Sequence, residues 1–285
     1  MGIFKNDSYD FKEKRAIVTG AGSGIGRELA LQLADKGCCV TVTDIFGERV
    51  EKVVMELQAK GVDAKGYTLD HSKLNEVKAF ADDYFATWKT VDILCSNAGV
   101  GAGGHLEELS LADWEWVMGA NLWGTVYMIH LFVPRMIERK TGKILITASG
   151  AGLIGIPGMA PYCASKFAMV GLGESLRSEL HRHNIQVNVL CPGIINTNIV
   201  KDGKVLFSDK DGQTAQAKIT GLYKRFGTKP STVARQGIQA LVRDTGIKLS
   251  PGFQMWPVYA LKRLSPALYQ GATRFFYKHL IFLEK

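Results

Sequence analysis

The chain has 285 residues, 46% of them hydrophobic and 22% charged, and a formal net charge of +8 at pH 7. This composition excludes a disordered or fibrous chain, and the length suits one large globular domain. Residues 201–285 hold 15 Lys and Arg against 5 Asp and Glu, a net of +10, so residues 1–200 carry −2. A solvated basic surface is the simplest interpretation of this asymmetry; contact with an anionic membrane, nucleic acid or an acidic substrate is the alternative.

The cysteine pattern and the N-terminus point to a reducing compartment. The cysteines are odd in number, lie mostly in apolar segments and include no C-x-x-C pair, which favours free thiols. The first residues carry Lys5, Asp7 and Asp10 without a long apolar core, so no secretory signal is expected. We therefore expect a cytoplasmic protein. None of the six histidines has metal-ligand spacing with cysteines or acids, so no catalytic metal is predicted.

Short apolar segments alternate with longer amphipathic ones along the chain, which is the pattern of strand–helix–strand units. It predicts an α/β fold, a Rossmann-like doubly wound seven-stranded parallel sheet, formed by a single domain with a C-terminal helical extension. The predicted strands are residues 15–19, 39–43, 64–68, 93–96, 143–148, 186–190 and 252–256. The predicted helices are residues 24–36, 48–60, 73–88, 111–138, 161–181 and 232–243. We place the catalytic domain at residues 1–257 and a basic amphipathic extension at 258–285.

A glycine-rich segment, Thr19-Gly-Ala-Gly-Ser-Gly-Ile-Gly26, joins the first strand to the first helix. Such a turn lets the backbone approach a pyrophosphate, and the N–H groups and dipole of the following helix stabilise the negative charge. The spacing is T-G-x-x-x-G-x-G, and taken alone it could also be an ordinary tight turn. The cofactor contacts predicted in this segment are Gly20, Ser23, Gly24, Ile25 and Gly26.

The second strand ends in Asp44, about twenty residues after the glycine-rich segment. A carboxylate in this place can accept both ribose hydroxyls of adenosine and would repel a 2′-phosphate. Asp44 therefore predicts NAD rather than NADP, unless it only caps the next turn. Arg27 is a nearby basic residue that could moderate the preference.

Residues 144–165 contain no charged residue and could be mistaken for a membrane span. Glycines and prolines, among them Gly155, Pro157 and Pro161, interrupt any helix long enough to cross a bilayer. We therefore reject a membrane span here.

Ser149 follows the fifth predicted strand, and Tyr162 and Lys166 begin the next helix. Residues i and i+4 share one helix face, so the phenol and the ammonium project together. A free tyrosine has a pKa near 10, and a nearby cation lowers it toward useful acid/base strength. Ser149 can hold the substrate oxygen near the phenol. A Y-x-x-x-K spacing is common on ordinary helices, but here the serine, the glycine-rich loop and the acidic strand end accompany it.

Residues 196–229 are rich in Asp, Gly, Lys and Thr, with only isolated apolar positions. A loop this long within a compact domain is typically a lid or a binding loop. We predict a substrate lid here.

The segment from Trp256 to Lys285 begins its final helix near Ser265-Pro266, with apolar residues at helical spacing and basic residues beside them. Three interpretations stay open. The helix packs on its own domain or on a partner subunit, covers an apolar substrate, or rests through residues 265–285 on an anionic membrane.

Together these motifs resemble the short-chain dehydrogenase/reductase family over residues 15–256, nearly the whole domain. The resemblance implies that Asn121, Ser149, Tyr162 and Lys166 form a catalytic tetrad, in which Asn121 holds a water that links Lys166 to solvent. It also implies that Tyr162 and Lys166 contact the cofactor, and that the protein is a homodimer or homotetramer. The further cofactor contacts that it implies are Asp70 beside adenine, the N-A-G motif Asn97, Ala98 and Gly99, and Pro192, Gly193, Ile195 and Thr197.

The resulting functional hypothesis is an NAD-dependent oxidoreductase that interconverts a secondary alcohol and a ketone. The tail and the aromatic residues suggest a bulky apolar substrate, such as a steroid, a retinoid or an acyl chain. The alternative is a cofactor-sensing, non-enzymatic binding protein on the same fold, although the intact tetrad argues against it. Nucleic-acid binding is not expected, because basic residues do not alternate with stacking aromatics in a recognisable module.

Overall fold

Strand β1 (Arg15–Thr19) lies in the middle of the main sheet. This position explains why apolar residues follow one another along it without alternation. It pairs in parallel with β2 (Cys39–Asp44) on one side and with β4 (Ile93–Ser96) on the other. Helices cover both faces of such a strand, so residues of both orientations must be apolar. Ala16 and Val18 accordingly face one core cluster, and Ile17 faces the other.

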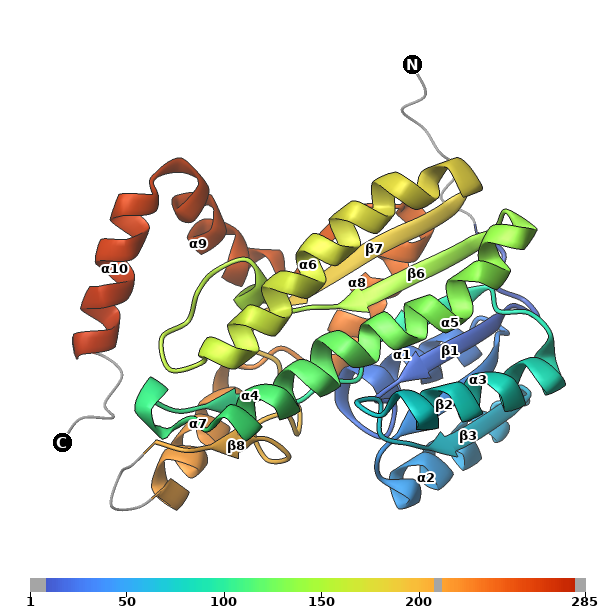
Figure 1. The fold of residues 1–285 in the computed structure, drawn as a ribbon, viewed down its shortest axis with the longest axis horizontal. Coiled ribbons are helices and arrows are strands. Elements are labelled where there is room, and N and C mark those ends of the chain that lie inside the picture. Colours follow the sequence, from blue (N-terminus) through green and yellow to red (C-terminus); the bar gives the residue numbers. More distant parts are fainter. Residues whose placement is uncertain (1–8, 208–211, 280–285) are drawn as a thin grey trace.

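The computed structural model describes residues 9–207 and 212–279, and its main sheet is parallel throughout (Figure 1). The strand order is β3-β2-β1-β4-β6-β7-β9. The chain adds strands toward one edge of the sheet from β1 to β3, and toward the other edge from β4 to β9. This arrangement confirms the predicted Rossmann-like, seven-stranded fold, in a single domain with a helical C-terminal region. The remaining strands of the main sheet are β3 (Ala64–Thr68), β6 (Gly142–Thr147), β7 (Ile185–Pro192) and β9 (Ile247–Ser250).

Two helical layers enclose the sheet (Figure 1). The layer on one face contributes α1 (Gly24–Ala34), α2 (Gly47–Gln58) and α8 (Pro230–Arg243) to the first core cluster. The layer on the other face contributes α3 (Leu74–Trp88), α5 (Gly124–Arg139) and α6 (Ala160–Leu180) to the second. Short 3-10 turns complete the connections, at η1 (Leu106–Glu108), η3 (Gly150–Gly152) and η4 (His181–His183).

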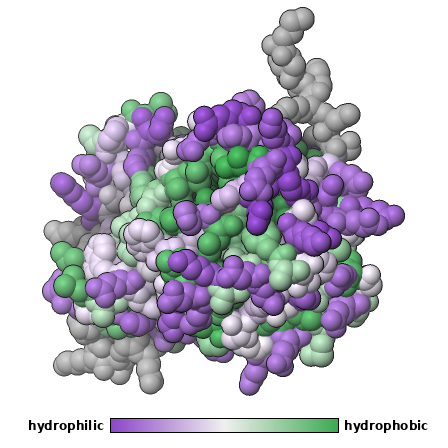
Figure 2. Space-filling model, turned by 45° about the vertical axis from the view of Figure 1, so that its right-hand side comes forward, coloured by the Kyte–Doolittle hydropathy of each residue, from purple (hydrophilic) through white to green (hydrophobic). Residues whose placement is uncertain are grey.

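The outer surface is not uniformly hydrophilic. On the face shown in Figure 2, apolar side chains gather in a central area that hydrophilic side chains surround. Helices α5 and α6 also leave several apolar side chains only partly buried against the second core cluster: Tyr127, Leu131, Leu172 and Leu176.

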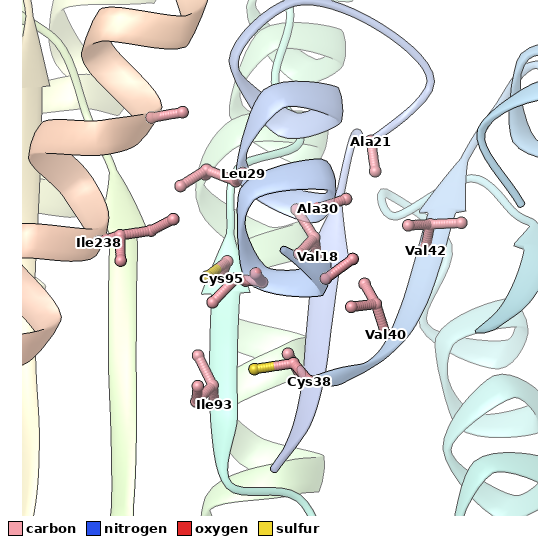
Figure 3. Close-up of a cluster of buried hydrophobic side chains, with 14 of the residues drawn as sticks. Val18, Ala21, Leu29, Ala30, Cys38, Val40, Val42, Ile93, Cys95 and Ile238 are labelled. Carbon is pink, nitrogen blue, oxygen red and sulfur yellow. The ribbon is translucent and has the colours of Figure 1, made fainter. Parts of the chain in front are cut away.

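The first core cluster packs α1, α2 and α8 against one face of the sheet. Figure 3 shows Leu29 of α1 and Ile238 of α8 close to Ile93 and Cys95 of β4. Leu29 and Ile93 are fully buried, and fully burying a side chain of this kind stabilises a fold by about 1.5–3 kcal/mol. The start of α1 is therefore fixed relative to the ends of the strands.

One long apolar helical segment forms much of the second layer. Helix α4 (Leu111–Met118) continues through a π-helical turn (Gly119–Trp123) into α5. Within the described residues, 111–139 is the one segment long and apolar enough by composition to cross a membrane. Met128, Phe132 and Met136 are fully buried against the sheet, so it is a core helix. Residues 144–165 form β6, η3 and the start of α6, which confirms that they are not a span.

The predicted seventh strand, residues 252–256, is wrong. The edge strand is β9 (Ile247–Ser250), which pairs with β7, and Gly252–Leu264 forms helix α9. A short apolar run does not distinguish a strand from a buried helix turn by periodicity, and Pro251 at the N-cap of α9 separates the two elements. Helix α9 also runs without a break across the domain boundary that we placed at residue 257.

The described residues of the segment 196–229 contain a strand and a helix where the sequence predicted a loop. They contain β8 (Lys204–Val205), paired with β5 (Ala102–Gly103), and helix α7 (Gly212–Phe226). The final helix, α10 (Pro266–His279), begins where the sequence predicted it. Residues 280–285 of the proposed membrane-contact segment lie outside the described residues.

Candidate active site

The turn between β1 and α1 has the backbone geometry that its glycines predict. Gly20 has φ +60 and Gly24 has φ +55, a region that residues with a side chain rarely adopt. A Cβ on Gly26 would lie 2.2 Å from the Gly20 carbonyl oxygen. A helix that begins at such a turn can present its first N–H groups to an anionic ligand.

Thr19 and Asn97 join the glycine-rich turn to the end of β4. The Thr19 hydroxyl accepts hydrogen bonds from the backbone N–H groups of Asn97 and Ala98, both at 2.9 Å. The Asn97 amide donates to the carbonyl oxygens of Thr19 at 3.1 Å and Gly20 at 3.3 Å. Thr19 and Asn97 therefore position the loop, which gives a structural reason for both motifs.

A pocket of about 290 Å³ opens at the carboxyl ends of β1, β2 and β4. Ligands bind at this switch point in doubly wound sheets. The buried atoms Thr147 Oγ1 and His71 Nδ1 belong to pocket-lining residues and have no hydrogen-bond partner among the described residues. A dinucleotide therefore fits both the glycine cradle and the unpaired polar atoms. The predicted contacts that line the pocket are Gly20, Ser23, Gly24, Ile25, Asp44, Asp70, Asn97, Ala98, Gly99 and Thr197.

Asp44 ends β2 at the wall of this pocket, with only 9% of its surface exposed. Its carboxylate accepts hydrogen bonds from the N–H of Gly22 at 2.8 Å and of Phe46 at 3.1 Å. It thus combines a turn-capping role with a position facing the pocket, so the two interpretations of the sequence are compatible.

Arg49 lines the same pocket and was missed by the sequence analysis. Its guanidinium lies 4.1 Å from the Phe46 ring centroid and forms two hydrogen bonds with Asp202, at 2.6 and 3.1 Å. Arg27, the basic residue that we had considered, instead pairs with Glu56 at 2.8 Å and does not line the pocket. Among the described residues that line the pocket, Arg49 is the one Lys or Arg.

Asp70 and His71 form the wall after β3. One Asp70 oxygen accepts hydrogen bonds from Ser72 N at 2.9 Å and Ser72 Oγ at 2.7 Å. His71 Nε2 lies 2.8 Å from Thr43 Oγ1, and burial lowers the pKa of His71 to about 4. His71 is therefore neutral at pH 7 and presents an uncharged polar edge to the pocket.

Ser149 and Tyr162 meet where β6 ends and α6 begins. Ser149 caps the 3-10 turn η3, and its Oγ accepts a hydrogen bond from Ala151 N at 3.1 Å. Burial raises the pKa of Tyr162 above its ordinary value, and a hydrogen bond with the Ser149 side chain acts in the opposite direction. This direction is opposite to the lowering that we expected from the field of Lys166. The Tyr162 phenol is therefore protonated at neutral pH.

Lys166 lies one helical turn beyond Tyr162 and is 3% exposed. Its Nζ donates to Thr147 O at 3.1 Å and lies 5.6 Å from the centroid of the Tyr162 ring. Burial lowers the pKa of Lys166 to about 8. The ammonium is thus held at the end of β6, beside the phenol, at a cost in desolvation.

Asn121 lies in the π-helical turn between α4 and α5 and is fully buried. Its Oδ1 accepts from Val100 N at 2.7 Å, and its Nδ2 donates to Val100 O at 3.0 Å and Ser165 Oγ at 2.9 Å. A Cβ on Gly99 would lie 2.9 Å from Asn121 Oδ1 and 3.4 Å from Lys166 Nζ. The structure therefore brings Asn121 and Lys166 together around Gly99.

Several predicted cofactor contacts lie outside the pocket lining. Gly26 is enclosed by the turn itself. Ile195 is 4% exposed within the first core cluster, and the Gly193 N–H donates to Ser250 O at 2.8 Å. Pro192 ends β7, where its carbonyl oxygen lies near Gly150. The structure therefore does not place these four residues in the lining of the pocket.

We expect Gly26→Ala to weaken NADH binding by about tenfold or more, because relieving the contact with Gly20 must deform the loop, and overpacking costs about 1–3 kcal/mol. Isothermal titration with NADH measures this effect. Gly171→Ala, on α6 with open space around the added carbon, is the matched control. Equal affinity of Gly26→Ala and wild type would contradict the assigned role of the loop.

The chain is similar to known proteins in both sequence and fold. A family model described as short chain dehydrogenase matches residues 14–204. The chain is 32% identical over 273 residues to the oxidoreductase SadH of Mycobacterium tuberculosis, covering 93% of this chain and 98% of SadH. It is 38% identical over 193 residues to the CLA biosynthesis dehydrogenase/reductase of Lactiplantibacillus plantarum, covering 67% and 68%. A crystal structure of a short-chain dehydrogenase/reductase from Burkholderia phymatum, in complex with NAD, superimposes with a TM-score of 0.85 at 30% identity, covering 92% and 96%.

Proposed function

Because this chain belongs to the short-chain dehydrogenase/reductase family of oxidoreductases, we propose that it interconverts a secondary alcohol and a ketone with NAD. The observation that carries the proposal is the arrangement of Ser149, Tyr162 and Lys166 next to a pocket with a glycine cradle. A protonated, buried phenol beside a buried lysine is suited to proton transfer at a substrate oxygen.

In the proposed mechanism, NAD supplies the hydride acceptor for alcohol oxidation and NADH the hydride donor for ketone reduction. The glycine cradle, Asp44 and the N-A-G motif hold the cofactor. Ser149 Oγ orients the substrate oxygen by a hydrogen bond. Tyr162 donates its phenolic proton to that oxygen in reduction. In oxidation the phenol first loses its proton to solvent, and the resulting phenolate accepts the proton of the alcohol. Lys166 stabilises the phenolate while the proton is away, and Asn121 fixes the backbone of Val100 beside it.

We propose NAD as the preferred cofactor because of the Asp44 carboxylate. Two similar solved structures contain NAD and another contains NADPH, so individual residues must decide the preference. A 2′-phosphate beside Asp44 would bring like charges together. Arg49 could neutralise such a phosphate only by giving up its pair with Asp202.

Asp44→Ser should therefore lower the ratio of kcat/KM for NAD over NADP by about tenfold to hundredfold, equivalent to about 1–3 kcal/mol. Steady-state kinetics with both cofactors measures the ratio. Asp202→Asn, which frees Arg49 without changing Asp44, is the matched comparison. A wild-type enzyme that prefers NADP would sink the assignment.

We further propose a bulky apolar substrate, such as a steroid, a retinoid or an acyl chain. Tyr162 packs in an apolar cluster with Ala151 and Cys163, which Ile156, Met159 and Ile199 extend. Helix α7 within the proposed lid supplies Tyr223, which contributes, after burial, to the raised pKa of Tyr162. An apolar wall on one side and a lid on the other exclude water from the reacting carbon. A screen of aliphatic, aromatic, steroid and retinoid alcohols for NADH formation at raised pH tests this class.

The alternative, a cofactor-sensing binding protein, shares the pocket but has no use for a buried lysine beside the phenol. NADH binding without turnover of any alcohol or ketone would favour it.

We also propose that the protein acts in the cytoplasm as a homodimer or homotetramer. The five free cysteines and the apolar area in Figure 2 support this proposal. Light scattering after size-exclusion chromatography measures the assembly.

A further inference from the structure

The helical hairpin of α9 and α10, residues 252–279, carries charge of one sign. Residues 245–279 hold five Lys and Arg and no Asp or Glu. Figure 1 shows α9 and α10 at one edge of the molecule, with α10 extending away from the sheet. A surface of this kind attracts an anionic partner and repels a second copy of itself.

One side of α10 is fixed to its own domain. Tyr269 is 8% exposed, and its hydroxyl donates to Gly155 O at 2.8 Å. At the end of α9, Lys262 Nζ donates to Leu153 O at 2.6 Å. Both acceptors lie in the loop between Ser149 and Tyr162. The hairpin is therefore oriented by the loop that borders the active site.

Away from the Tyr269 contact, the hairpin exposes large apolar residues at the end of α9 and along α10. Leu264 is 85% exposed, Leu268 66% and Phe275 60%. Leu268 and Phe275 are seven positions apart and so share one helix face. Arg274 is exposed beside Phe275. A single exposed leucine is ordinary, but an apolar row on a basic helix is the pattern of a helix that lies at a lipid interface.

We propose that this apolar and basic face, Leu264, Leu268, Phe275, Arg263 and Arg274, docks on an anionic lipid bilayer. The apolar side chains enter the headgroup region, and the arginines pair with lipid phosphates. An anionic bilayer fits both halves of the face. A nucleic acid would pair with the arginines but not with the apolar side chains. A second copy of the hairpin would repel the arginines, because it carries the same charge.

Docking would bring the active site close to the lipid. A Cβ on Gly150, the residue after Ser149, would lie 2.2 Å from Met255 Cε, so α9 packs directly on the catalytic turn. If the substrate is apolar, as proposed above, it would reach Tyr162 from the bilayer without crossing water. This last step rests on the proposed function, but the docking itself does not.

Co-sedimentation of the full chain with phosphatidylglycerol–phosphatidylcholine vesicles tests the docking. We expect binding at low salt, weaker binding at high salt, and little binding to pure phosphatidylcholine. The double substitution Leu268→Glu and Phe275→Glu should lower the bound fraction by about tenfold or more. Met55→Glu on α2, a position 62% exposed and far from the hairpin in sequence, is the matched control and should bind as wild type does.

Wild type that remains in the supernatant with anionic vesicles, or a double variant that binds as well as wild type, overturns the docking. So does a double variant whose mass by light scattering is lower than that of wild type, because the face is then a contact between subunits. The docking would also be overturned if wild type bound a DNA duplex and this binding was weakened by Arg274→Gln but retained in the double variant. NADH affinity and turnover of a water-soluble alcohol should be unchanged in the double variant, so failure of docking and failure of the proposed activity are distinguishable.

Discussion

Replacing Tyr162 by phenylalanine is expected to lower kcat by a factor of about 10²–10⁴, the usual contribution of a positioned acid/base group. The substitution removes one oxygen from a site that is 7% exposed and leaves the ring in its apolar cluster. The fold and the pocket should therefore persist. Only the transferable proton is lost, while Ser149 and Lys166 stay in place.

The expected result is measured as kcat in both reaction directions, together with the NADH dissociation constant. NADH should bind within a few-fold of wild type, because the pocket at the ends of β1, β2 and β4 is unchanged. Tyr84→Phe is a matched control. Tyr84 is also buried and loses one hydrogen bond, from its hydroxyl to Thr90 O, far from the site. A Tyr162→Phe enzyme that keeps kcat within tenfold of wild type would refute the assigned role.

Replacing Lys166 by methionine should lower kcat/KM by about a thousandfold or more, a loss within the range of acid/base and electrostatic contributions. The methionine fills a similar volume but supplies no charge near the Tyr162 phenol and no donor to Thr147 O. The family resemblance also implies a bond from this lysine to the nicotinamide ribose. The NADH dissociation constant should therefore rise as well, which separates this variant from Tyr162→Phe.

The same variant should be more stable than wild type at pH 7. Lys166 has its pKa lowered from 10.5 to about 8, so burying its charged form costs about 3 kcal/mol below pH 8. The unfolded chain binds more protons between pH 8 and 10, so the stability of wild type rises with pH in this window. Tyr162, whose pKa is raised, acts only above pH 10, where it reverses that trend. Thermal unfolding at pH 7 and pH 9.5 measures both effects. A Tm below that of wild type at pH 7 would contradict the assigned desolvation.

Local motifs in the sequence predicted the parts of the site that lie on one element or at one junction. Tyr162 and Lys166 are four residues apart on α6, and Gly20 to Gly26 form a single turn, so spacing alone carries their geometry. The central strands were predictable because burial on both faces demands continuous apolar segments. The edge strand β9 was not, because its four residues are only half-buried except for Ser250.

The remaining parts of the site depend on contacts between distant segments. Arg49 is held at the pocket by hydrogen bonds to Asp202, which lies 153 positions away in the sequence. Tyr223 lies in a helix that the sequence analysis treated as a loop, because its apolar positions are isolated. The pKa of Tyr162 depends on burial, which the sequence does not encode locally, so the expected direction of its shift was opposite to the one found. His71 belongs to no sequence motif, and only the structure, where it lies beside Thr43, identifies it as a residue of the pocket lining.

The most direct test of the proposed activity is a continuous assay of NADH absorbance with wild type, NAD and a panel of apolar secondary alcohols at raised pH. We expect NADH to form with at least one alcohol of the panel, and the rate with Tyr162→Phe to fall to about one hundredth or less. Tight NADH binding with no turnover of any alcohol or ketone, in either direction, would contradict the account and favour a cofactor-sensing protein.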